Sequence, residues 1–154
     1  MLLQRGVTGF FNWDERGVVP EFSFREFKEL VYGAAAAAQF DVCELAERGI
    51  TPNFHTALNN CEGRNFAILG HSIYPIIAFA EPLKPMSCQL NFIDCPQITL
   101  ELVRLFPHVK VAYHADLTQI LSDAELSNLD NMEIEQVNYW KPTTVGETMF
   151  NWWD

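Results

Sequence analysis

The chain has 154 residues, of which 49% are apolar and 19% charged, a balance that fits one globular domain with a buried core. Twenty acids against ten bases give a net charge of −10. That charge repels the phosphates of nucleic acids and anionic lipids, and it attracts basic proteins. We therefore expect a single domain over residues 1–154 that binds no nucleic acid and no membrane. The alternative is that the acidity only keeps the chain in solution.

The sequence contains neither a targeting segment nor a disulfide framework. Residues 1–6 lack the apolar run of a signal peptide, and no apolar stretch reaches the roughly 18 residues needed to span a bilayer. The four cysteines, at positions 43, 61, 88 and 95, form no Cys-x-x-Cys pair. We therefore expect a cytoplasmic protein with reduced thiols.

The clearest local pattern predicts a helix over residues 23–38. Ser23 and Glu26 have the spacing of a capping box, in which each side chain satisfies a backbone N–H of the first turn. Apolar residues follow at spacings of three and four, and five alanines at 34–38 raise the helix propensity. Before this helix we expect a short strand or extended lead-in over residues 2–11 and a loop over residues 12–20.

Short apolar runs separated by turn residues predict a sheet in the middle of the chain. The expected strands cover residues 40–45, 54–59, 65–69, 73–80 and 88–93. Residues 43–48 also fit a helical turn, and Pro75 should mark the beginning or an edge of its strand. Because the connections are short, we expect antiparallel pairing. A second helix over residues 98–106, ended by Pro107, and a last strand over residues 108–114 follow.

The last forty residues, 115–154, combine negative charge with aromatic side chains. They hold eight acids against one base, and three of the four tryptophans. Capping patterns that begin at Ser122, Asp130 and Thr144 predict three short helices in series. The residues of this segment expected to face inward are Met132, Val137, Val145, Met149 and Trp152. The predicted fold class is thus α+β, with an antiparallel sheet of about five strands, a long N-terminal helix and a C-terminal cap of short helices.

No motif specifies a reaction. The histidines, at positions 55, 71, 108 and 114, lack the i, i+4 spacing of a helical zinc site, so we expect no metal and no cofactor. A Gly-x-Ser-x-Gly elbow and a phosphate-binding glycine loop are also absent. The leading expectation is a chain without catalytic residues. The alternative is a small enzyme in which Cys61 or Cys88 meets a histidine in space.

Three stretches resemble parts of a known group of bacterial proteins. Residues Asn138–Asp154, Arg5–Phe10 and Tyr74–Ala80 are similar to segments of immunity proteins, which accompany polymorphic toxins and contact-dependent growth inhibition toxins. The resemblance implies a cytosolic, non-enzymatic protein that binds the C-terminal domain of a cognate toxin, often a nuclease, and covers its active site. It leaves open whether the protein is a monomer or a homodimer, and an adaptor domain is a further alternative.

An acidic inhibitor would associate quickly with a toxin domain that is basic, as nuclease domains commonly are. We therefore expect the acids of the C-terminal segment to contact the partner. These acids are Asp116, Asp123, Glu125, Asp130, Glu133 and Glu135. The alternative is that they form a solvated helix face.

Overall fold

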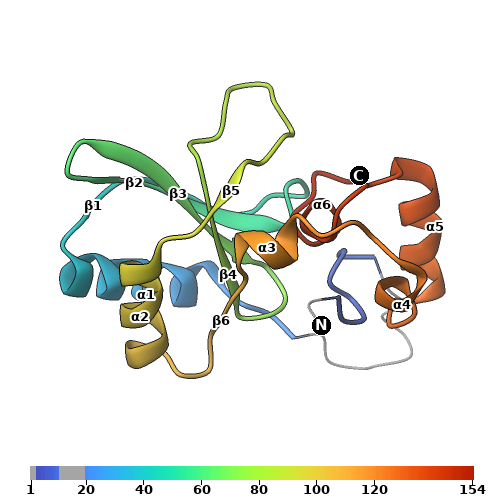
Figure 1. The fold of residues 1–154 in the computed structure, drawn as a ribbon, viewed down its shortest axis with the longest axis horizontal. Helices are drawn as coiled ribbons and strands as arrows, with labels where there is room; N and C mark the ends of the chain where they lie inside the picture. Colours follow the sequence, from blue (N-terminus) through green and yellow to red (C-terminus); the bar gives the residue numbers. More distant parts are fainter. Residues whose placement is uncertain (1–2, 11–19) are drawn as a thin grey trace.

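A six-stranded sheet forms the centre of the molecule in the computed structural model, which describes residues 3–10 and 20–154 (Figure 1). The strands are β1 (Asp41–Ala46), β2 (Phe54–Cys61), β3 (Arg64–His71), β4 (Ile76–Ala80), β5 (Phe92–Ile93) and β6 (Lys110–Val111). Strands β1 to β5 pair in chain order and antiparallel, as predicted from the short turns. The expected strand over residues 2–11 is wrong for residues 3–10, which form turns, and the expected loop at residues 12–19 lies outside the described residues.

The turn between β2 and β3 explains why this hairpin could be predicted. Glu62 and Gly63 both have positive φ, at 52° and 83°, the requirement of a two-residue type I′ turn. The Asn60 side chain accepts a hydrogen bond from the Gly63 N–H at 3.1 Å and supports the turn. The twist of such a turn matches that of the strands, so β2 and β3 pair along their whole length, from Cys61 with Arg64 to Phe54 with His71.

The strands after β4 differ from the prediction. Strand β5 covers two residues rather than 88–93, and β6 covers two rather than 108–114. Strand β6 runs parallel to β4, pairing with Ile76 and Ile77, whereas β5 pairs with Phe79 and Ala80. The two short strands therefore lie end to end on the same edge of β4, and the expected strand ends early because His114 begins a helix.

The helices occupy opposite sides of the sheet. They are α1 (Phe24–Ala38), α2 (Pro96–Leu105), α3 (His114–Leu117), α4 (Asp123–Leu126), α5 (Asn131–Trp140) and α6 (Val145–Met149). The predicted long helix and the three predicted caps are confirmed, because the side chains of Ser23, Ser122, Asp130 and Thr144 each accept a backbone N–H at a helix start. No helix in residues 3–10 and 20–154 is long and apolar enough to cross a membrane.

Both faces of the sheet are covered along β3 and β4, whereas most of the edge strand β1 is exposed. On one face Phe66 and Ile68 of β3 pack with α1 and α2. On the other face Ala67 and Leu69 pack with residues 3–7 and with the C-terminal helices. This alternation follows from the two-residue period of a strand. In Figure 1, α4 and α5 stand together at the end of the molecule away from α1 and β1.

Candidate functional site

Two of the six predicted contact acids are structural. Glu133 is 0% exposed. Its Oε1 accepts the N–H groups of Gly6 and Asp130 at 2.7 and 3.1 Å, and its Oε2 accepts the N–H and the hydroxyl of Thr8 at 3.0 and 2.5 Å. Asp130 caps α5 and pairs with Arg5 at 2.6 Å. Glu133 is therefore not accessible to a partner in this fold, and we correct its predicted role to that of an internal anchor. Asp130, with a side chain 10% exposed, is reassigned in the same way.

The other four predicted acids lie at the surface but do not form one cluster. Asp116 on α3, Asp123 on α4 and Glu135 on α5 are exposed, and Glu125 on α4 is half-buried. Asp116 and Glu125 line the same cleft of about 390 Å³, together with Lys110. The structure thus brings these two acids together, and leaves Asp123 and Glu135 outside that cleft.

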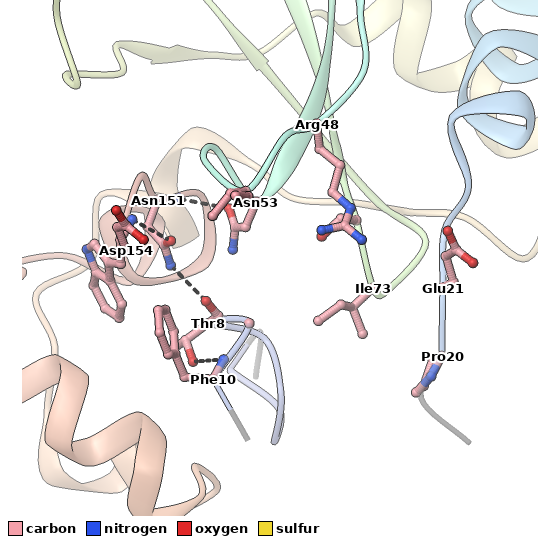
Figure 2. Close-up of a pocket in the computed structure, with 13 residues that line it drawn as sticks. Thr8, Phe10, Pro20, Glu21, Arg48, Asn53, Ile73, Asn151 and Asp154 are labelled. Atoms are coloured by element: carbon pink, nitrogen blue, oxygen red, sulfur yellow. Dashed lines mark hydrogen bonds between the residues drawn. The ribbon is translucent and has the colours of Figure 1, made fainter. Parts of the chain in front are cut away.

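A buried polar network joins residues 3–10 to the sheet and to the end of the chain (Figure 2). The Asn53 side chain donates to the carbonyls of Val7 and Met149 at 3.3 and 2.9 Å and accepts the Asn151 N–H at 2.9 Å. The Asn151 side chain in turn donates to the Thr8 carbonyl at 3.3 Å. These side chains satisfy backbone groups that have no partner in a helix or strand, which buried polar groups require. Sequence patterns missed this network because its members are far apart in the chain.

The cleft drawn in Figure 2 has a volume of about 420 Å³ and opens beside this network. Arg48, Ser72 and Asp154 line it, as do the two flanking ranges 8–10 and 20–21.

Two of the four histidines, His55 and His71, use both ring nitrogens in hydrogen bonds to the backbone. His55 donates from Nε2 to the Phe22 carbonyl at 2.8 Å and accepts the Arg48 N–H at Nδ1. His71 donates from Nε2 to the Val7 carbonyl at 2.7 Å and accepts two backbone N–H groups at Nδ1. With both ring nitrogens engaged, neither imidazole is free to take a proton from a thiol.

The thiols of the enzyme alternative differ in their exposure. Cys88 is exposed and Cys61 half-buried, and neither makes a hydrogen bond to a histidine within the part of the chain described. Burial raises the pKa of the Cys95 thiol to about 11, which makes it a poor nucleophile. Among the described residues there is also no group of three His, Cys, Asp or Glu side chains that could hold a metal ion.

The environment of His71 predicts a loss of stability in acid. Burial lowers the pKa of this histidine from 6.5 to about 4, so the unfolded chain binds a proton more readily than the folded chain between these values. The free energy of unfolding should therefore fall as the pH drops below 6.5, by up to about 3 kcal/mol near pH 4. Urea unfolding at pH 7.5 and 4.5 measures this fall. His71→Asn, which keeps an acceptor but does not titrate, should show a smaller fall, and an equal fall in both proteins would contradict the assignment.

The outer face of α5 carries the exposed aromatic residues of the C-terminal segment. Tyr139 is 75% exposed and Trp140 is 40% exposed, and their rings meet edge to face with centroids 5.1 Å apart. Met132 is 45% exposed, so the prediction that it faces inward is wrong. The α5 surface, by which we mean Met132, Glu135, Tyr139 and Trp140, combines three residues at the three- and four-residue spacing of one helix face with Trp140, whose ring contacts that of Tyr139.

Trp140 is held in place despite its exposure. Its indole N–H donates to the Gln136 side chain at 3.0 Å, and its ring lies parallel to that of the buried Trp153, with an interplanar angle of 3°. A rigid, exposed aromatic side chain is typical of an anchor in a protein–protein interface. The α5 surface is therefore the best candidate functional site among the described residues.

Comparisons with known proteins give no further support for any function. No protein-family model matches the chain, no curated protein is similar to it, and no solved structure matches it. The candidate site therefore rests on the geometry and chemistry of its own residues.

Proposed function

We propose that the chain is an immunity protein that binds the toxic domain of a cognate, basic toxin and covers its active site. The observation that carries this proposal is the α5 surface, where the exposed Tyr139 lies one helical turn from Glu135 and its ring contacts that of the exposed Trp140. The sequence resemblance of residues 138–154 to bacterial immunity proteins supports the same function.

The composition of this surface is more typical of a binding site than of a solvated helix face. Aromatic residues are enriched in interface cores, and exposed large apolar side chains that are grouped together mark sites of association. A net charge of −10 would steer a basic partner toward the molecule and raise the association rate. The aromatic pair would then supply the short-range contacts that slow dissociation.

The first test is whether the chain neutralises and captures its partner. The tagged protein should form a one-to-one complex with the C-terminal domain of the toxin encoded beside it, and its expression should protect cells from that domain. Failure to bind the neighbouring toxin at low salt, together with failure to protect, would reject the proposal.

Reversing the charge of Glu135 should slow association with that toxin. We expect Glu135→Lys to lower the association rate constant about three- to tenfold at low salt, because the substitution places a positive charge one helical turn from Tyr139. Glu26→Lys is the matched control, since it changes the net charge equally at an exposed position on α1. Stopped-flow fluorescence measures both rates, and equal slowing by the two variants would show that only the net charge matters.

A further inference from the structure

A further hollow lies on the same side of the sheet as the C-terminal helices, between β1 and the end of the chain. This Trp152 groove has a volume of about 280 Å³. Its lining is mostly apolar, with Leu58, Leu83 and Trp152 among the contributing side chains. Trp152 is half-buried, and its ring packs edge to face on Phe54 with centroids 5.1 Å apart. This contact fixes the position of the Trp152 ring at the groove.

The charges around the Trp152 groove have one sign. Glu44 and Glu47, both exposed, line it, and none of the described basic residues does. Neither carboxylate makes an ion pair within the described residues, whose salt bridges lie elsewhere. An apolar hollow beside two unpaired carboxylates is complementary to an apolar side chain that has lysine or arginine next to it.

Trp152 also connects this hollow to the candidate site. A larger groove of about 350 Å³ is lined by Trp152 and by Trp140 of the α5 surface, and its charged residues are Lys141 and Glu147. The two grooves therefore share Trp152 as a common wall, and an extended segment that contacts Trp140 can continue past Trp152 toward β1.

We propose that the Trp152 groove receives an apolar side chain from a basic, extended segment of the partner, with Glu44 and Glu47 pairing with the flanking lysine or arginine residues. This inference rests on the proposed function for the identity of the partner, and it adds a second contact, on β1, to the one on α5. The two carboxylates favour a positively charged segment, and the apolar groove favours a segment with an apolar side chain next to its basic residues.

The first test uses a probe that does not depend on the toxin. An end-capped hexapeptide of alternating lysine and leucine is titrated into the ¹⁵N-labelled protein, with a glutamate–leucine hexapeptide as the charge control. We expect chemical-shift changes at the Trp152 indole N–H and at the amides of Ala46 and Leu58, and none with the acidic peptide. Changes confined to α5, or no changes, would overturn the proposal.

Charge reversal then tests the role of the two glutamates. The double variant Glu44→Lys with Glu47→Lys should raise the Kd of the basic peptide at least about tenfold. The matched control is Glu26→Lys with Glu29→Lys on α1, which packs on the opposite face of the sheet, and it should change the Kd less than about twofold. Equal effects of the two double variants would overturn the proposal.

The same variants separate this inference from the proposed function. If the cognate toxin binds the wild-type protein and the Glu44→Lys, Glu47→Lys variant with equal affinity, the groove is not a contact and the immunity function stands. If the toxin does not bind at all but the basic peptide occupies the groove with the expected charge dependence, the groove stands and the immunity function fails.

Discussion

Replacing Glu133 with glutamine is expected to lower the free energy of unfolding by about 3–5 kcal/mol. Both carboxylate oxygens accept hydrogen bonds from N–H or O–H donors, and all of these bonds are buried or part-buried. A glutamine side chain has one oxygen and one NH₂ group, so at least one backbone N–H, that of Thr8 or those of Gly6 and Asp130, would face another donor. Each charge-assisted bond that is lost costs about 1.5–3 kcal/mol, and the unpaired donors add a desolvation cost.

Urea unfolding followed by tryptophan fluorescence measures the effect of Glu133→Gln. The matched control is Glu135→Gln on the same helix, where the side chain is exposed and the change should be within about 0.5 kcal/mol. Limited proteolysis should also cut residues 3–10 more rapidly in the Glu133 variant, because Gly6 and Thr8 lose their partners. Equal stability of the two variants would mean that Glu133 does not anchor this segment.

Replacing Phe150 with alanine is expected to cost about 3–5 kcal/mol, the range measured for truncation of a buried phenylalanine. Phe150 is 1% exposed, and its ring packs against Phe54, His71 and Phe92 with centroids 5.7, 5.9 and 6.0 Å away. The substitution would leave a cavity where the end of the chain meets the sheet.

Thermal and urea unfolding of Phe150→Ala measure this cost. Phe150→Leu should be less destabilising, because leucine fills part of the cavity, and Tyr139→Ala at an exposed position should change the stability little. A loss smaller than about 1 kcal/mol for Phe150→Ala would show that the C-terminal segment is not docked through this ring.

The elements that could be predicted from the sequence are those fixed by neighbouring residues. The first helix follows from the Ser23 cap and the apolar spacing after it, and the β2–β3 hairpin follows from the glycine of its turn. The capping box of Asp130 and Glu133 could also be predicted from the sequence, because its two residues lie three apart in the chain. Local chemistry decides each of these features.

What could not be predicted depends on contacts between distant parts of the chain. The capping pattern accounts for the bond from the Asp130 N–H to Glu133, but not for the bonds from Gly6 and Thr8, which lie 127 and 125 residues away. The parallel pairing of β6 with β4 has no local signal, because it depends on the path of α2 between them. Contacts with distant residues also bury Glu133, so the predicted group of contact acids differs from the candidate site on α5, which includes the exposed Tyr139 and Trp140.

The long separation between the partners of residues 3–10 has a consequence for synthesis on the ribosome. These residues bind to Glu133 and, through the Thr8 carbonyl, to Asn151, which lies 143 residues later. Residues 3–10 therefore leave the exit tunnel long before these hydrogen-bond partners have been made. Contacts of this length also slow folding after release, since a large loop must close before they form. We expect hydrogen exchange during refolding to protect the α1–β2–β3 region first and the amides of Gly6 and Thr8 last.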